Sequence, residues 1–327
     1  MSTKPRFSAN INTFNSGADR YVLSGYGERY PTEELIRLAT SVPGLSGVEL
    51  VGLWHVNDQN VEQIRRWVKD AGLIVTCVTP DIWASAKWGK GSFASNDPAI
   101  RRDAIQEVKK SMDWAKQLDC EVIDLWFGQD GYDYPFQADY IAGWERIVEG
   151  VIECAEHQPD VKIVLEYKPK EPRTHCFIAT VGKTLLLVQK VNKPNVGAMI
   201  DVGHALMAYE NTAESAALLS YFGNKLFYMH FNDNWRLWDD DMTVGSIHII
   251  ETLELLYWLD RVGYQGWYAL DIFPYRENGV RAATESIRWI QALHGLLDKM
   301  GRDEIAKVLA SGDAMQGTAL IREALLG

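Results

Sequence analysis

Apolar runs of the strand type alternate with amphipathic segments along almost the whole chain. The eight apolar runs lie at 7–14, 47–54, 73–79, 121–127, 162–167, 196–202, 226–231 and 266–273. Segments with helical periodicity follow them at 32–40, 61–71, 96–118, 140–157, 181–191, 212–221, 247–262 and 280–300, and one more lies at 302–326. The strand segments are apolar on both faces, which is typical of a parallel sheet covered by helices.

Eight strand–helix pairs in this order predict an α/β fold, the (β/α)8 TIM barrel. An open doubly wound sheet would also alternate, but it normally carries a Gly-rich phosphate turn, and neither GxGxxG nor a Walker pattern is present. No linker or low-complexity tract interrupts the chain, so we expect a single catalytic domain over residues 1–300. Residues 301–327 form a helical extension outside the barrel, which could pack against a neighbouring subunit.

Charge and cysteine content narrow the class of protein. The formal net charge of −11 over 327 residues argues against general binding to nucleic acid or to anionic membranes, because both favour basic surfaces. No apolar run reaches the roughly 18 residues that span a bilayer, and the first residues lack the apolar core of a secretory signal. The cysteines form no CxxC pair and are expected to be free thiols in a cytoplasmic protein. They are Cys77, Cys120, Cys154 and Cys176.

Ionisable residues at the predicted strand ends indicate a metal site. In TIM barrels the catalytic groups come from the carboxyl ends of the strands. Four consecutive strands end in such residues, namely Glu166, Asp201, His230 and Asp271. Carboxylates and imidazole are ligands of hard or borderline divalent cations, and burying them without a counter-ion is costly. We therefore predict that these four side chains converge on one cation.

A second set of the same residue types follows the sixth and seventh strands. His204 comes three residues after the aspartate of strand six, and a triple aspartate follows strand seven. His204, Asp239 and Asp241 could hold a second cation a few ångströms away, whereas Asp240 is expected in solvent. Simpler alternatives exist, because an Asp at a strand end often caps the next helix and His230 could be a hydrogen-bonded core residue.

The segments around these residues resemble a known superfamily. LEYKPKEP, MIDVGH, HFND…DDDMTVGS and LDIFPYR are similar to the strand ends of xylose-isomerase-like barrels, most of all to two-metal L-rhamnose isomerases of the bacterial type that also acts on other aldoses. The resemblance is dense over 126–276 and thin before it. It implies two divalent cations per subunit, of Mn²⁺, Mg²⁺ or Co²⁺. The implied ligands are Glu166, Asp201, His230 and Asp271 for a structural cation, and His204, Asp239 and Asp241 for a catalytic cation, with Asp201 as a candidate bridge.

The resemblance also implies catalytic roles for Lys168, His55 and Asp239. Lys168 lies two residues beyond Glu166, on the same side of the strand, and would donate to the sugar's O1 and stabilise an oxyanion. His55 would bind ring or terminal hydroxyls and help to open the ring. The alternatives are a salt bridge from Lys168 to a ligand carboxylate, and a loop histidine satisfied by the backbone.

Three further residues are expected to contact the sugar together with Lys168 and His55. Trp126 and Asp130 resemble the tryptophan-containing wall of the family at strand four, although Trp126 could also be a packing residue at the barrel top. Trp235 lies in the loop NDNWRLW, which we expect to face the sugar.

The implied activity is aldose–ketose interconversion of a free sugar, since no phosphate-binding loop is evident. A pentose, a 6-deoxyhexose such as L-rhamnose or a branched pentose such as D-apiose would suit it, in a dimer or tetramer. Hydrogen would pass between C2 and C1 as hydride, or as a proton through an enediol. Competing hypotheses are a ketose 3-epimerase, whose eighth strand ends in Glu, a C-glycoside-cleaving lyase subunit and a non-catalytic sugar-binding barrel.

Overall fold

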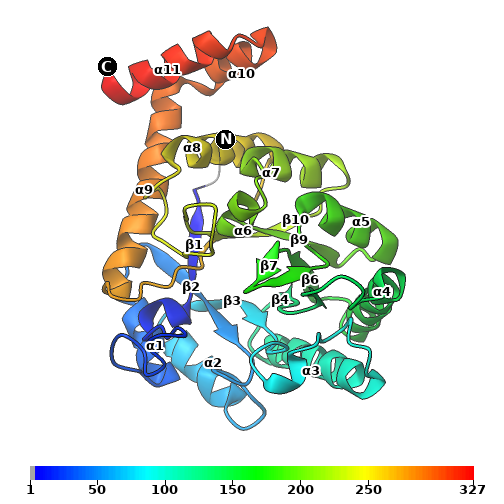
Figure 1. Cartoon of the computed structure of the whole chain (residues 1–327). Coiled ribbons are helices and arrows are strands. Elements are labelled where there is room, and N and C mark those ends of the chain that lie inside the picture. Colours follow the sequence, from blue (N-terminus) through cyan, green and yellow to red (C-terminus); the bar gives the residue numbers. More distant parts are fainter. Residues whose placement is uncertain (1–3) are drawn as a thin grey trace.

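A computed structural model describes residues 4–327 and shows a closed barrel of eight parallel strands (Figure 1). In chain order the strands are β1 (Arg6–Asn10), β2 (Leu45–Val51), β3 (Ile74–Thr79), β4 (Val122–Trp126), β6 (Lys162–Glu166), β9 (Val196–Asp201), β10 (Leu226–Phe231) and β11 (Trp267–Leu270). Pairing of β1 with both β11 and β2 closes the sheet. The predicted TIM barrel is confirmed.

Helices surround this barrel, one after each strand. They are α1 (Thr32–Ala39), α2 (Val61–Asp70), α3 (Pro98–Gln117), α4 (Tyr140–His157), α5 (Val181–Val191), α7 (Thr212–Tyr221), α8 (Ile249–Val262) and α9 (Gly279–Met300). Their starts follow from capping residues. Asp97 accepts from Ala99 N–H ahead of Pro98 at the first turn of α3, and Asn278 accepts from Arg281 N–H at the start of α9.

Several short elements were not predicted. The 3₁₀ turn η2 (Ala86–Trp88) and the short helix α6 (Val202–Met207) lie in loops at strand ends. A second 3₁₀ turn, η1 (Ile11–Phe14), corrects the first predicted strand, because β1 ends at Asn10 and the rest of the apolar run 7–14 forms this turn. A small antiparallel sheet also joins the β4–α4 loop to the β6–α5 loop, and its strands are β5 (Gly131–Tyr132), β7 (Lys170–Glu171) and β8 (Thr174–Cys176). Strands of two or three residues are too short to leave a visible alternation in the sequence.

The C-terminal extension is two helices rather than one. Gly312, with φ of 65°, ends α10 (Arg302–Ser311), and α11 (Ala314–Leu326) follows. Figure 1 shows α9 leading away from the barrel to this pair. Among the described residues no helix is long and apolar enough to cross a membrane.

A layer of side chains inside the barrel shows which residues at the strand ends face the interior. One buried cluster draws a single residue from each of six strands: Cys77, Val122, Val164, Met199, Tyr228 and Ala269. Successive side chains of a strand point to opposite faces, so residues two positions further along face the same interior. Above four members of this layer stand Glu166, Asp201, His230 and Asp271, which explains why these four residues meet.

Candidate metal centre

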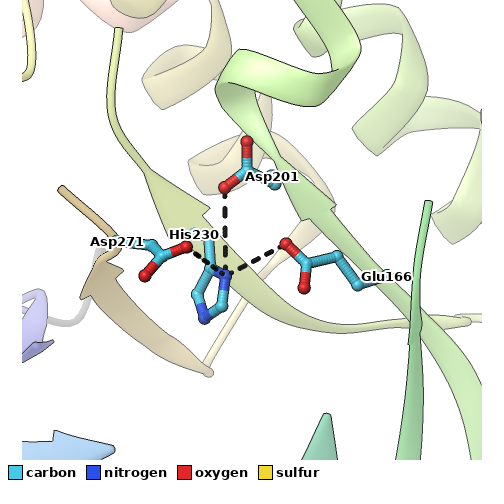
Figure 2. A group of neighbouring side chains, drawn as sticks. All are labelled: Glu166, Asp201, His230 and Asp271. Carbon is cyan, nitrogen blue, oxygen red and sulfur yellow. Dashed lines mark hydrogen bonds and ion pairs between the residues drawn. The ribbon is translucent and has the colours of Figure 1, made fainter. Parts of the chain in front are cut away.

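The four strand-end side chains form one compact cluster at the top of the barrel (Figure 2). One ligand atom of each lies within 4.8 Å of the others. Nδ1 of His230 lies 3.3 Å from Glu166 Oε1, 3.8 Å from Asp271 Oδ2 and 3.9 Å from Asp201 Oδ2. Three carboxylates and one imidazole nitrogen are a suitable donor set for a divalent cation such as Mn²⁺ or Mg²⁺.

Amide side chains hold two of these carboxylates in place. Asn232 Nδ2 donates to Asp201 Oδ2 over 2.9 Å and to the backbone carbonyl of Asp271 over 3.1 Å. Asn10 Nδ2, at the end of β1, donates to Asp271 Oδ1 over 3.1 Å. Such partners orient metal ligands from outside the ligand set. Asp201 also caps α6, because its Oδ1 accepts from His204 N–H (2.8 Å). Asp201 is therefore both a helix cap and a member of the cluster.

A second cluster shares Asp201 with the first. Asp201, His204 and Asp239 each offer one ligand atom within 4.8 Å of the other two. His204 Nε2 lies 3.2 Å from Asp239 Oδ2. Two buried atoms here, His204 Nδ1 and Asp239 Oδ1, have no hydrogen-bond partner among the described residues, although Glu166 Oε1 is 3.3 Å from the former. Buried polar atoms are rarely left unpaired, so this cluster also suits a cation.

The other two members of the triple aspartate differ from Asp239. Asp241 lines the cavity and lies 3.4 Å from Asn232 Nδ2, but it is not one of the three residues that meet in the second cluster. Asp240 stays outside both clusters, and its carboxylate accepts from Trp235 N–H over 2.9 Å. It therefore shapes the loop rather than pointing freely into solvent.

Lys168 brings a positive charge to the second cluster. Its Nζ lies 2.7 Å from Asp239 Oδ2, forms an ion pair with Glu171 and lies 5.2 Å from the centre of the Trp126 ring. Burial opposes the charged form, but Asp239 and Glu171 outweigh it and hold the pKa of Lys168 well above its usual value. The predicted salt bridge between Lys168 and a candidate metal ligand, Asp239, is present. It keeps the charged Nζ at the edge of the cavity.

The remaining charges show an excess of carboxylates. Burial raises the pKa of Asp271 to about 7 and that of Asp201 to about 6. Burial, together with Asp239 and Asp271, raises the pKa of Asp241 well above its usual value. Asp239 differs, because Lys168 and His204 outweigh its burial and lower its pKa. Divalent cations would supply the positive charge that this carboxylate set lacks, so the residues present fit such a group.

The clusters open into a cavity of about 420 Å³ with an aromatic wall. Trp54, Trp83 and Trp126 line it in sequence, with ring centres 6.1 Å and 4.8 Å apart. Trp54 Nε1 donates to Asp81 Oδ2 (2.8 Å), which fixes the first ring. Trp126 was predicted to form a wall and does line the cavity. Trp54 and Trp83 were not among the named sugar contacts, although Trp54 ends one predicted strand and Trp83 lies four residues beyond another.

Two of the predicted substrate contacts, Asp130 and Trp235, are not among the residues that line the cavity. Asp130 is buried, and its carboxylate accepts from the backbone N–H groups of residues 92, 93 and 94 at 2.7–3.0 Å and from the hydroxyl of Ser92. These donors hold the carboxylate inside a loop, and Asp130 is not among the residues that line the cavity. The side chain of Trp235 is 62% exposed and does not line the cavity, because the loop turns it outward.

His55 lies behind a residue that lines the cavity, Asn12, rather than in the cavity lining itself. Its ring is buried, and Val51 N–H donates to Nδ1 over 2.9 Å. The proton must therefore be on Nε2, which lies 3.2 Å from Asn12 Oδ1. Asn12 lines the cavity, whereas His55 does not. Donation to Oδ1 leaves the NH₂ group of Asn12 to meet a ligand.

Fold and site together define a TIM barrel whose strand ends gather carboxylates and histidines beside a polar and aromatic cavity. The chain belongs to the xylose isomerase-like TIM barrel family, whose model matches residues 36–293. A xylose isomerase of Thermus thermophilus is 29% identical over 234 residues, which cover 69% of this chain. The chain spans 60% of the length of that relative.

Solved structures with the same fold include sugar epimerases. A D-tagatose 3-epimerase-like protein superposes with a TM-score of 0.67 at 19% identity, covering 90% of this chain and 98% of the other. A D-psicose 3-epimerase of Clostridium cellulolyticum H10 gives a TM-score of 0.68 at 18% identity, covering 88% and 99%. Such identities show a shared fold. The chain is thus a xylose isomerase-like TIM barrel that shares its fold with sugar epimerases. Its closeness to L-rhamnose isomerases stays a prediction.

Proposed function

We propose that the protein is an aldose–ketose isomerase that depends on divalent cations and acts on a free sugar. The observation that carries the proposal is the pair of adjacent ligand clusters that share Asp201, with Lys168 at the edge of the second. The proposed ligands are Glu166, Asp201, His230 and Asp271 in the first cluster, and Asp201, His204 and Asp239 in the second, with Asp241 beside them. Cations bound there would polarise sugar oxygens and lower the pKa of sugar hydroxyls.

The side chains around the clusters have complementary tasks. Lys168, held charged by Asp239 and Glu171, donates from Nζ to the sugar's O1 and stabilises the oxyanion that develops there. The tryptophan wall packs against the C–H face of the open-chain sugar and excludes water. Asn12, oriented by His55, donates to a hydroxyl further along the chain.

A ketose 3-epimerase is the second candidate. One support is the presence of epimerases among the structural neighbours. The other is that the carboxylates of Glu166 and Asp271 both lie near Nδ1 of His230, as an acid–base pair around one cation would. The second cluster supports the isomerase instead, as does an aspartate at position 271, which is one methylene shorter than the glutamate expected of an epimerase. A C-glycoside-cleaving lyase would need a partner chain and has no observation of its own.

A substrate screen tests the proposal. The purified protein is incubated with Mn²⁺ and free aldoses, among them L-rhamnose, D-apiose and D-xylose, and ketose formation is followed by chromatography. We expect conversion of at least one aldose, loss of activity after chelation and two equivalents of cation per chain. Conversion of a ketose into its C3 epimer without any aldose would overturn the isomerase in favour of the epimerase.

Two neighbouring aspartates offer a matched pair of variants. Asp239→Asn is expected to remove the second cation and the isomerisation, while the first cluster keeps its cation. Asp240→Asn changes the adjacent residue, which lies outside both clusters, and is expected to retain both cations and most of the activity. Equal behaviour of the two variants would contradict the assignment.

A further inference from the structure

Glu49 is a buried carboxylate inside the barrel that the proposed chemistry does not use. It lies in the middle of β2, paired in register with Asn10 of β1 and Cys77 of β3, and is 1% exposed. A charge-bearing side chain in an apolar strand costs free energy unless its oxygens are fully paired. The contacts of Glu49 therefore indicate what the barrel gains from it.

Both carboxylate oxygens of Glu49 meet donors from β10. Tyr228 OH lies 2.7 Å from Oε1, and His230 Nε2 lies 3.0 Å from Oε2. Tyr228 OH is also 2.9 Å from Thr76 Oγ1, which contacts the hydroxyl of Ser8 over 2.5 Å. Glu49 thus stands between a hydroxyl network below it and the ring of a candidate metal ligand above it.

The two nitrogens of His230 face opposite partners. Nε2 faces Glu49, whereas Nδ1 faces the carboxylates of Glu166, Asp201 and Asp271. A carboxylate can only accept hydrogen bonds, so its contact with Glu49 favours a proton on Nε2. A ring with its single proton on Nδ1 would instead set the lone pair of Nε2 against a carboxylate oxygen and block the nitrogen that faces the cluster.

We propose that Glu49 is a positioning residue of the metal centre: it holds the proton of His230 on Nε2 and thereby presents the lone pair of Nδ1 to a divalent cation. The inference rests on the proposed function only in that it assumes a cation in the first cluster. A carboxylate that accepts from the far nitrogen of a ligating histidine fixes both the tautomer and the ring orientation. Glu49 reaches this place across the interior of the barrel, since β1 and β11 separate β2 from β10 in the sheet.

Three variants test the proposal by metal binding rather than turnover. Glu49→Leu removes both acceptors, and we expect the affinity of the first cluster for Mn²⁺, measured by calorimetry on metal-free protein, to fall by about 10–100-fold. Glu49→Gln keeps the length of the side chain and one acceptor oxygen, and it is expected to retain most of the wild-type affinity. Tyr228→Phe, the control, removes the other partner of Glu49 and should change the affinity by less than about threefold, because the contact with His230 remains.

A second readout reports the tautomer directly. In the Mg²⁺-loaded wild type, ¹⁵N-resolved NMR of the imidazole should show the proton of His230 on Nε2, and Glu49→Leu should lose this signal while its circular dichroism stays that of a folded barrel. Wild-type affinity in Glu49→Leu, or an equal loss at both clusters with no change of tautomer, would overturn the positioning role. Intact cation binding without isomerisation would overturn only the proposed function.

Discussion

At the scale of single residues, Lys168 carries the sharpest expectation. Its Nζ is the charged partner of Asp239 at 2.7 Å. Lys168→Met keeps the length of the stem and removes the donor to a developing oxyanion, a loss that typically lowers kcat by about 10²–10³-fold. We expect this fall at saturating Mn²⁺ with the first cluster still loaded. The exposed Lys170→Met serves as the control, and a Lys168→Met variant within tenfold of wild type would remove the lysine from catalysis.

His55 gives an expectation on pH. Burial lowers its pKa from 6.5 to about 4, so the folded protein keeps the ring neutral while the unfolded chain takes up a proton. The stability from this neutral ring is present above pH 6.5 and is lost as the pH falls toward 4. Between pH 7 and pH 5 the free energy of unfolding of wild type should fall by about 2 kcal/mol more than that of His55→Gln. Denaturant unfolding measures both proteins at both pH values. An equal fall in the free energy of unfolding of wild type and His55→Gln would contradict this expectation.

At the scale of elements, Asp130 holds the 92–94 loop by hydrogen bonds. Its substitution should lower the stability of the fold more than the affinity for substrate. Its carboxylate accepts from three backbone N–H groups of the 92–94 loop. Asp130→Asn would turn an NH₂ group toward these donors, and leaving buried donors unpaired costs about 1–3 kcal/mol each. We expect a clear drop in the free energy of unfolding, measured in urea, with KM changed by less than about threefold. A large rise in KM without a loss of stability would restore Asp130 as a substrate contact.

The strand ends were predictable from the sequence, whereas the loops were not. In each of four strands the ligand candidate is two positions beyond an interior residue, as Asp201 is beyond Met199, and the period of two fixes the side it faces. Trp235 and Asp130 lie in loops, where the direction of a side chain depends on contacts between distant segments. Glu49 left a usable signal, a carboxylate inside the apolar run GVELVG, but its distance from the strand end hid its role.

At the scale of the whole molecule, the extension α10–α11 is separable from the barrel. α10 contains no buried residue and α11 contains one, Ala324. Truncation after Gly301 should therefore leave Mn²⁺ binding by both clusters unchanged in calorimetry. Loss of binding in a folded truncated protein would show that the extension supports the centre. Light scattering of the same protein tests our expectation that the extension lies at a subunit interface, since the oligomer should then dissociate.

Cation removal should destabilise the whole barrel, because buried carboxylates crowd its top end and the interior just below it. They include Glu49, Asp124, Glu166, Asp201, Asp239, Asp241 and Asp271. A ligand that binds only the folded state adds about 4 kcal/mol at a concentration of 1,000 times its Kd. We therefore expect EDTA to lower the Tm by several degrees and Mn²⁺ to restore it.

The share of each cluster in this stabilisation can be separated by variants. Asp239→Asn should keep the part of the Mn²⁺-dependent Tm rise that comes from the first cluster. Asp201→Asn should lose nearly all of it, because Asp201 is the one residue that both clusters share. The two variants are compared by calorimetric scans with and without Mn²⁺. A full rise in Asp201→Asn would mean that the cations bind elsewhere, and equal losses in both variants would mean that the two clusters hold a single cation.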